Sequence, residues 1–462
     1  MKLTVLGGGG VRSPFLAKSL ALQAEKVGIK SIVFMDNNIE KLNIYGVLAQ
    51  EIFTRLNKNI SFSLTSDPIE AVKDADYIIT TIRVGEEEGR VKDERVALKY
   101  NVLGQETTGP GGFAFSLRSI PVILNYCKLI EKYSKKNAIL FNFTNPAGLV
   151  TQAVKNSGFS KKFYGICDAP SELIRQIAEI VNEKEENIQV ECFGLNHLSW
   201  FRNIRINNED KTQEIINNPR IYKETEMRYF DRELIKLSDN MLLNEYLYFY
   251  YYREKAIQAI KESGKTRGEQ VVEINKIMLE ELKKIDIRAN TSKAFEIYFT
   301  HLLERESSYM ARESGVEKTN KRKVIPLDEF LQLPESGGYA GVAIDILQAA
   351  STNHDKRIVV SVPNNGSFSF LDDNDVIEVS CTIDENGDVH PLKINDIPKM
   401  QENLIKTVKL YENLTVEAIF EKSIEKAIKA LTVHPLVGSY SLAKDIVYDY
   451  LDVHKEYMQD WK

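Results

Sequence analysis

The first 36 residues restrict the fold more than any other stretch of the chain. An apolar run at residues 3–6 leads directly into four consecutive glycines at residues 7–10, and a helical pattern follows. A second apolar run, residues 31–35, then ends at Asp36. Strand, glycine turn, helix and strand in this order predict the start of a βαβ unit, and therefore an α/β fold built on a parallel sheet.

The glycine turn and Asp36 indicate a dinucleotide site. The backbone at Gly7, Gly8 and Gly9 can approach a pyrophosphate closely, and the N-terminus of the next helix favours its negative charge. A carboxylate at the end of the second strand accepts hydrogen bonds from a ribose 2′-hydroxyl and repels a 2′-phosphate, so Asp36 favours NAD over NADP. Arg12 stands where the third glycine of G-x-G-x-x-G would be, and a glycine-rich turn can also be a plain connector.

Length and composition set further limits. With 462 residues, of which 43% are hydrophobic and 27% charged, the chain is long enough for two or three domains. Its net charge of −6 argues against a nucleic-acid partner. We expect no membrane span, because no apolar run approaches the length needed to cross a bilayer. We also expect a cytoplasmic location, because the chain enters a strand without a signal-peptide pattern.

The strand predicted at residues 76–82 continues the sheet and ends at Arg83. The charge-dense stretch that follows, residues 86–95, has the composition of a solvated loop. However, open parallel sheets place their ligands beyond the carboxyl ends of the strands. Arg83 and Arg90 are therefore candidates for an anion-binding pair at this edge.

The next predicted strand, residues 138–143, delivers Asn145 to the same edge. The loop before it, residues 103–112, has two turn signals with polar side chains between them, which is typical of a loop that contacts a ligand. Pro146 ends the strand, so the Asn145 amide can donate to a ligand and accept from it. A simple Asx turn is the structural alternative.

A thiol and an imidazole follow two more strand patterns. Cys167 and Asp168 come directly after one apolar run, and Asn196 and His197 come directly after the next. Because Cys167 stands at the N-terminus of a predicted helix, we expect a lowered pKa and a thiolate. A lone cysteine or histidine is more often structural. Together at strand ends, beside Asp168 and Asn196, they indicate a divalent metal with positions open to substrate oxygens.

The second half of the chain has a different pattern. Long helical patterns begin near residue 205, and residues 359–366 and 376–381 form a predicted antiparallel pair. We therefore predict an N-terminal Rossmann-type dinucleotide-binding domain at 1–195 and a C-terminal mixed α+β domain at 196–462.

Three features of the second half are candidates for the site or for an interface. Residues 246–252 form an aromatic run that belongs to the core or to a subunit interface. Arg267 lies in a basic turn beside a glycine, which is a weak signal for anion binding. Tyr339 begins a predicted helix after two glycines, where it is either a general base or a cap on the core.

These motifs together closely resemble glycoside hydrolase family 4, the NAD- and Mn-dependent glycosidases, and within it the 6-phospho-β-glucosidases. The resemblance covers essentially the whole chain. It rests on Gly7-Gly8-Gly9 with Asp36, Gly104-Gln105-Glu106-Thr107, Asn142-Phe143-Thr144-Asn145-Pro146, Gly165-Ile166-Cys167-Asp168-Ala169-Pro170, Gly194-Leu195-Asn196-His197 and Pro363-Asn364-Asn365-Gly366. It implies NAD and Mn²⁺ or another divalent metal as cofactors, a phosphorylated disaccharide or glucoside as substrate, a lactate/malate dehydrogenase-like N-terminal domain, and a homodimer or homotetramer.

The resemblance also implies a mechanism. NAD takes a hydride from C3 of the sugar, the resulting ketone acidifies the proton on C2, the aglycone leaves, water adds and the hydride returns. Cys167 and His197 hold the metal, which polarises the oxygens on C2 and C3, and Tyr339 removes the C2 proton. The remaining implied contacts are those of the substrate: Arg90 to the 6-phosphate, Arg83 and Arg267 as further candidates for it, and Asn145 and Asn196 to the sugar.

Asp168 departs from the usual pattern of the β-specific members, which carry asparagine after the metal cysteine, whereas α-specific members carry aspartate. An aspartate here can protonate the leaving oxygen as a general acid. The sequence around Arg90 and at 141–148 looks more like the β-specific members. Our first prediction is therefore a 6-phospho-β-glucosidase, with a 6-phospho-α-glucosidase as the alternative. Outside the family, a 2-hydroxy-acid dehydrogenase would share the nucleotide fold without a metal, and an NAD-sensing regulator would show no turnover.

Overall fold

A parallel sheet in the order β3-β2-β1-β4-β5-β6 forms the N-terminal half of the protein. Its strands are β1 (Lys2–Leu6), β2 (Ser31–Met35), β3 (Ser61–Thr65), β4 (Tyr77–Thr80), β5 (Ile139–Asn142) and β6 (Lys162–Gly165). This computed structural model describes residues 1–316, 323–334, 339–352, 357–384 and 388–462. The strand order is that of a Rossmann-type fold, so the predicted fold class is confirmed.

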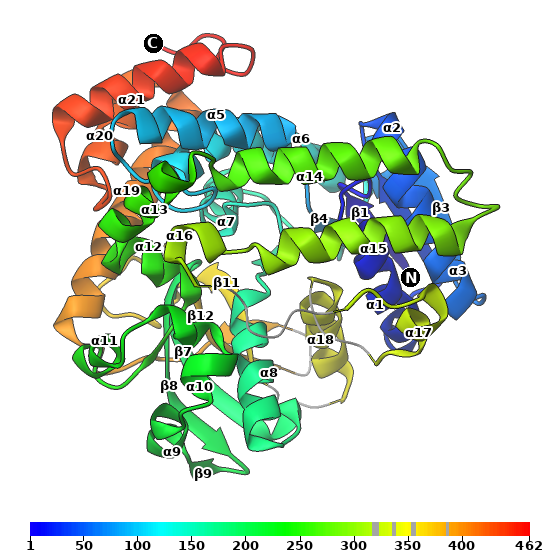
Figure 1. The fold of residues 1–462 in the computed structure, drawn as a ribbon, viewed down its shortest axis with the longest axis horizontal. Helices are drawn as coiled ribbons and strands as arrows, with labels where there is room; N and C mark the ends of the chain where they lie inside the picture. The colour runs from blue at the N-terminus through cyan, green and yellow to red at the C-terminus, as the bar shows by residue number, and fades with distance from the viewer. Residues whose placement is uncertain (317–322, 335–338, 353–356, 385–387) are drawn as a thin grey trace.

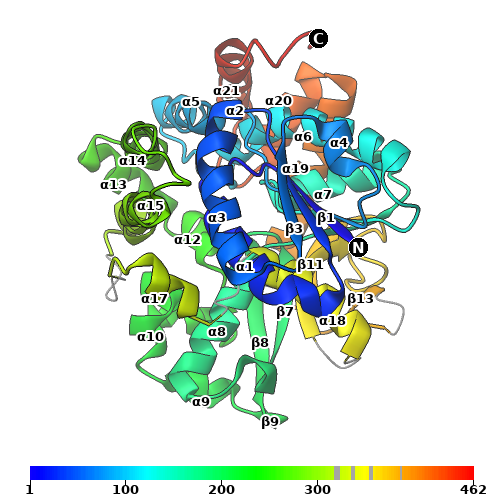
Figure 2. The ribbon, with the colours of Figure 1, turned by 90° about the vertical axis from the view of Figure 1, so that its right-hand side faces the viewer.

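Helices cover both faces of the parallel sheet. Figure 2 shows α1 and α3 on one side of the strands and α4, α6 and α7 on the other. The helices of this half are α1 (Ser13–Gln23), α2 (Ile39–Lys41), α3 (Val47–Leu56), α4 (Pro68–Val72), α5 (Glu86–Lys99), α6 (Pro110–Tyr133), α7 (Ala147–Asn156) and α8 (Ala169–Val181).

Among the described residues, α6 alone is long and apolar enough, by length and composition, to cross a membrane. Its apolar window is 61% buried inside the protein. Arg118 on this helix also pairs with buried Asp93 over 2.7 Å. Core helices pass the same test of length and composition, so α6 is weak evidence for a membrane span.

Residues 86–95 are wrongly predicted as a loop, because they form most of helix α5. Arg90, Asp93 and Glu94 on this helix are buried. Arg90 pairs with Glu94, and Asp93 pairs with Arg118. Since ion pairs take the place of apolar contacts on its buried face, the helix lacks the hydrophobic periodicity by which sequence analysis identifies helices.

An antiparallel sheet continues the parallel one beyond β6, in the order β11-β12-β7-β8-β10. A single pairing of Ser361 with Gly165 joins the two parts, and Ser361, Glu378 and Gly194 then follow one another across the strands. The predicted antiparallel pair is confirmed as β11 and β12. The strands are β7 (Ile188–Leu195), β8 (Leu198–Ile206), β9 (Glu209–Asp210), β10 (Leu242–Leu243), β11 (Arg357–Pro363), β12 (Val376–Ile383) and β13 (Val389–Pro391).

Helices from the second half pack on helices of the first half. The long helices α14 and α15 run side by side, and α14 also packs on α5 (Figure 1). The helices are α9 (Thr212–Asn217), α10 (Ile221–Glu224), α11 (Arg232–Leu237), α12 (Tyr248–Tyr251), α13 (Arg253–Ser263), α14 (Arg267–Leu282), α15 (Thr291–Ser307), α16 (Ala311–Ser314), α17 (Leu327–Gln332), α18 (Tyr339–Thr352), α19 (Lys399–Glu421), α20 (Ile424–Val433) and α21 (Tyr440–Val453). One hydrophobic cluster contains residues of both sheet parts, so the two halves share a core.

Candidate functional site

Cys167 and His197 meet although they follow different strands. Cys167 lies between β6 and α8, and His197 lies in the tight turn between β7 and β8. The Sγ atom of Cys167 is 3.5 Å from Nε2 of His197. The other ring nitrogen of His197, Nδ1, lies 2.8 Å from Oγ1 of Thr107. Thr107 therefore orients the imidazole with Nε2 toward the thiol.

The turn that carries His197 depends on a glycine. Gly194 has a φ of +144°, and a Cβ there would lie 2.1 Å from the carbonyl oxygen of Leu198. His197 itself has a φ of +65°, a conformation that non-glycine residues adopt only rarely. Only glycine fits at position 194, where the chain enters the turn. The turn then holds His197 in a rare backbone conformation, with its ring facing the thiol.

The protein alone holds the thiol and the imidazole in their neutral forms. Burial, and then the nearby carboxylates of Glu378 and Asp168, raise the pKa of the Cys167 thiol well above its ordinary value. The expectation of a lowered pKa at this helix N-terminus is wrong, because loss of water outweighs the helix. Burial also lowers the pKa of His197 to about 3, and a neutral imidazole is the form that binds metals.

The chemistry of this pair fits a divalent cation. A cysteine sulfur and an imidazole nitrogen both bind divalent first-row transition metals. A cation beside the sulfur would stabilise the thiolate, which is the form that binds metal. In the described part of the chain, no group of three His, Cys, Asp or Glu side chains forms a closed ligand set. Two protein donors leave positions open to substrate oxygens, as the sequence predicts.

Tyr246 borders the pair, although the sequence indicates it only as part of an aromatic run. Its ring stacks on His197, with 3.8 Å between centroids and 13° between planes. Leu247, Tyr248 and Phe249 are buried, so this part of the aromatic run belongs to the core. Because neighbouring residues of the run belong to the core, the sequence does not distinguish Tyr246 as a residue of the site.

A cavity of about 800 Å³ joins most of the predicted residues. It is lined by Cys167, His197, Asp168, Asn145, Arg83, Arg90 and Arg267, and also by Tyr246 and Glu106. Asn196 lies instead beside Glu378, to which its Nδ2 donates over 2.9 Å. Tyr339 begins α18, but its side chain falls outside the described part of the protein.

Glu106 ties the two predicted anion-binding arginines together. Arg83 and Arg90 both donate to its carboxylate, and Arg90 also donates to Glu94 over 2.7 Å. Burial alone would raise the pKa of Glu106, but the guanidinium groups of Arg83 and Arg90 outweigh it and hold the pKa well below the usual range. Glu106 lies in one of the motifs shared with the family, but nothing in the sequence predicts that it pairs with the two arginines.

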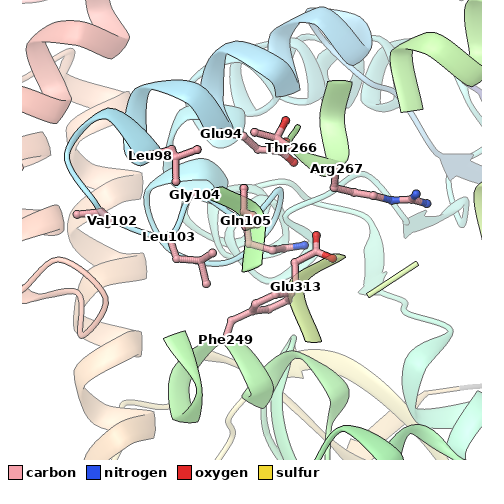
Figure 3. Close-up of a pocket in the computed structure, with 11 residues that line it drawn as sticks. Glu94, Leu98, Val102, Leu103, Gly104, Gln105, Phe249, Thr266, Arg267 and Glu313 are labelled. Atoms are coloured by element: carbon pink, nitrogen blue, oxygen red, sulfur yellow. The ribbon is translucent and has the colours of Figure 1, made fainter. Parts of the chain in front are cut away.

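Arg267 lies near this cluster and begins α14. Its Nη1 donates to Oγ of Ser308 over 2.6 Å. Burial, followed by nearby Arg90, lowers the pKa of Arg267 to about 10. Figure 3 shows its side chain pointing away from the other labelled residues of a small cavity of about 20 Å³, which Gln105 and Glu313 also line.

Asp168 stands at the N-terminus of α8, directly after Cys167. Its side chain is 36% exposed and lies 3.5 Å from Nη1 of Arg12. Burial by the cavity wall raises the pKa of Asp168, and the Arg12 guanidinium opposes this shift. A carboxyl with a raised pKa at the cavity surface can give a proton to a substrate oxygen.

The glycine turn is as tight as its sequence suggests. A Cβ at Gly7 would lie 2.5 Å from the carbonyl oxygen of Thr81, and one at Gly8 would lie 2.5 Å from Cβ of Phe34. The backbone amide of Gly9 donates to Oδ2 of Asp36 over 2.9 Å. The four predicted cofactor residues therefore form one local unit at the end of β1 and β2.

Comparison with known proteins decides the family. Residues 2–183 match the family 4 glycosyl hydrolases, and residues 192–437 match the family 4 glycosyl hydrolase C-terminal domain. The chain belongs to glycoside hydrolase family 4. It is 31% identical to the 6-phospho-beta-glucosidase BglT of Thermotoga maritima, over 99% of this chain and 100% of that one. It is 29% identical to the 6-phospho-alpha-glucosidase of Leptotrichia buccalis, over 98% of each chain.

Solved structures agree with this family. The Thermotoga maritima 6-phospho-beta glucosidase, solved with manganese, NAD⁺ and glucose-6-phosphate, has a TM-score of 0.80 at 30% identity and covers 99% of both chains. A lactate dehydrogenase from a deep-sea metagenome, 14% identical with a TM-score of 0.51 over 91% of this chain and 98% of that one, shares the fold alone. Both anomeric specificities occur among the relatives, so family membership does not decide between them.

Proposed function

We propose that this family 4 glycosidase hydrolyses 6-phosphoglucosides, with NAD and a divalent metal as cofactors. The observation that carries the proposal is the Cys167–His197 pair, 3.5 Å apart, on the wall of a cavity that Arg83 and Arg90 also line. The pair suits a metal, and the arginines suit a phosphate. We propose β-glucosides as the first substrate, supported by the 31% identity to BglT, and α-glucosides as the alternative.

The two cofactors supply the chemistry that side chains lack: when bound, NAD exchanges a hydride with the sugar and the metal acts as a Lewis acid on its oxygens. Gly7, Gly8 and Gly9 leave room for the pyrophosphate, and Asp36 accepts from the ribose. Arg90 and Arg83, held by Glu106, bind the 6-phosphate, with Arg267 as a further candidate.

The remaining residues orient the sugar and move protons. Asn145 lines the cavity and can both donate to a sugar hydroxyl and accept from it. Asn196, held by Glu378, lies next to the metal ligand His197 in the β7–β8 turn. We assign to Asp168 the protonation of the leaving oxygen.

The base that removes the C2 proton is one of two tyrosines. The sequence favours Tyr339 by family resemblance. Tyr246 is favoured by its position, because its ring stacks on His197 and lines the cavity. A base must lie within hydrogen-bond reach of the proton that it takes, so we place Tyr246 first.

A 2-hydroxy-acid dehydrogenase is the alternative outside the family, and membership of glycoside hydrolase family 4 argues against it, since the lactate dehydrogenase shares the fold alone. Such an enzyme forms NADH in net amount and has no use for the thiol–imidazole pair. We further propose domains at 1–195 and 196–462, a cytoplasmic location, and a homodimer or homotetramer, in line with the family resemblance.

Paired 4-nitrophenyl α- and β-glucoside 6-phosphates test the proposal. The protein, supplied with NAD and Mn²⁺, should release nitrophenol from one anomer without net NADH formation, and chelation or exhaustive removal of NAD should stop it. Hydrolysis that persists after both cofactors are removed would reject the mechanism. Net NADH formation with lactate or malate would favour the dehydrogenase instead.

A further inference from the structure

The first residue of α5, Glu86, bonds to the segment that follows β2. Its Oε1 accepts from Nδ2 of Asn38 over 2.8 Å, and its Oε2 lies 3.0 Å from Nζ of Lys41. The Glu86 and Lys41 side chains are 44% and 27% exposed, so an incoming ligand can reach the pair. Because β2 ends just before Asp36, Glu86 comes from another part of the chain to the neighbourhood of the cofactor carboxylate.

Asn38 links Glu86 to Asp36. The backbone amide of Asn38 donates to Oδ1 of Asp36 over 2.9 Å, and its side-chain oxygen accepts from the Lys41 amide over 3.0 Å. With the two contacts of Glu86, these bonds close a ring through Asn38, Lys41 and Glu86. The ring holds the Lys41 ammonium group at Glu86.

The same segment packs on the glycine turn. A Cβ at Gly9 would lie 2.9 Å from Oδ2 of Asp36 and 3.0 Å from the backbone nitrogen of Leu42, the residue after Lys41. In folds of this type, the carboxylate at the end of the second strand accepts from the ribose 2′-hydroxyl. The 2′-phosphate of NADP takes the position of that hydroxyl, so it is exposed to the charges close to Asp36.

Lys41 and Glu86 are close enough to Asp36 to act on its charge. Burial raises the pKa of Asp36 most, the amides of Asn38 and Gly9 oppose this shift, and Lys41 and Glu86 act in opposite directions. Burial alone would also raise the pKa of Glu86, but the hydrogen bond and the charge of Lys41 hold it below its usual range. Glu86 is therefore ionised at neutral pH.

This cluster carries an excess of one negative charge. Asp36 and Glu86 are two carboxylates around the ammonium group of Lys41. The next carboxylate along the chain, Glu40, pairs with Lys283 over 2.9 Å and leaves the balance unchanged. A cation near the ribose accommodates a 2′-phosphate in nucleotide-binding folds, and here Glu86 already neutralises that cation.

We infer that Glu86 determines cofactor specificity, because it excludes NADP by neutralising Lys41. A ribose hydroxyl needs only the Asp36 carboxylate, whereas a 2′-phosphate needs a free cation to offset the charge of Asp36. While Glu86 is present, the Lys41 ammonium stays in the ring, and Glu86 adds its own repulsion. The inference rests on the proposed function, because it takes Asp36 and the glycine turn as the cofactor site.

The test measures nucleotide binding to the intact protein, separately from turnover. Calorimetry gives the Kd for NAD and the Kd for NADP in wild type, in Glu86→Gln and in the double variant Glu86→Gln/Lys41→Met. Glutamine keeps an acceptor for Asn38 and removes the charge that holds Lys41. Glu88→Gln is the matched control, since Glu88 is exposed in the first turn of the same helix and its substitution changes the net charge equally.

We expect Glu86→Gln to lower the Kd for NADP by about tenfold, equivalent to about 1.4 kcal/mol. The Kd for NAD should change by less than about threefold on the same scale, which also shows that the variant folds. The added Lys41→Met should remove the gain for NADP.

Three results would overturn the inference alone: no gain for NADP in Glu86→Gln, an equal gain in Glu88→Gln, or a gain that persists in the double variant. The last result would mean that loss of repulsion, and not release of Lys41, admits the phosphate. Failure of the wild type to bind either nucleotide would overturn the proposed cofactor site, and the role of Glu86 with it.

Discussion

Asn196 donates a hydrogen bond from Nδ2 to Oε2 of Glu378 over 2.9 Å. Ser199 donates to the other carboxylate oxygen over 3.2 Å, and Glu378 is only 1% exposed. Burial raises the pKa of Glu378 to about 7, although both hydrogen bonds oppose the shift. A buried carboxyl group that titrates near neutral pH therefore supports the turn of His197.

This raised pKa predicts a loss of stability between pH 5 and pH 8. The folded state binds the Glu378 proton more tightly than the unfolded state, so its contribution is present at low pH and is lost as pH rises through about 7. The loss is on the order of 3 kcal/mol. Glu378→Gln cannot titrate, and its thermal midpoint should fall less over this interval than that of wild type. Equal falls in the two proteins would contradict the prediction.

Cys167→Ser should abolish turnover and leave NAD binding intact. A serine hydroxyl stays protonated and is a poor ligand for the cation, so we expect activity below about 1% of wild type. Mn²⁺ binding and NAD binding are measured separately by calorimetry. Cys127→Ser, at a buried position of α6, is the matched control and should retain both activity and metal. Wild-type turnover in Cys167→Ser would refute the metal assignment.

Thr107→Val should weaken metal binding without removing a ligand. The variant keeps the shape of the side chain but loses the oxygen that lies 2.8 Å from Nδ1 of His197. Loss of such an orienting partner typically lowers metal affinity by about 10- to 100-fold. Titration with Mn²⁺ measures the change, and Thr54→Val on the exposed side of α3 serves as the control. An unaltered Mn²⁺ affinity would mean that Thr107 does not orient the ring.

Asp36→Asn should narrow the preference for NAD over NADP. The carboxylate accepts from the Gly9 amide at the glycine turn, and its charge repels a 2′-phosphate. Replacing it with a neutral amide should raise the Kd for NAD by about tenfold, roughly 1.4 kcal/mol, and lower the Kd for NADP. Fluorescence titration with both nucleotides measures the ratio of the Kd for NADP to the Kd for NAD. The prediction requires this ratio to fall in the variant.

Local patterns were enough to predict the fold and the proximity of Cys167 and His197. Gly7 to Gly9 and Asp36 lie on one βαβ unit, so their proximity follows from strand–turn–helix geometry. Cys167 and His197 each follow a recognisable strand. Their joint position at strand ends predicted that they meet, although β11 and β12, which separate β6 from β7, come from far along the chain.

The partners of these residues could not be predicted, because each comes from a distant segment. Thr107 and Glu106 lie in a turn-rich loop whose polar character was visible, but nothing in that loop identifies His197 and Arg83 as their partners. Glu378 lies on a strand whose sequence pattern predicts a buried strand and nothing about a functional site. The pKa of Cys167 was predicted in the wrong direction because burial, which dominates it, is a property of the folded protein.

The two candidate bases can be separated by matched substitutions. Tyr246→Phe removes only the hydroxyl and keeps the ring that stacks on His197, and Tyr339→Phe makes the same change at the residue that family resemblance favours. Removing a general base lowers kcat by about 10²–10⁴-fold, and we expect this loss in Tyr246→Phe. Because proton removal from C2 becomes slower, the kinetic isotope effect with C2-deuterated substrate should rise in that variant. Tyr339→Phe should stay within about threefold of wild type on the same scale. The reverse pattern would assign the base to Tyr339 and leave Tyr246 as a support for the imidazole.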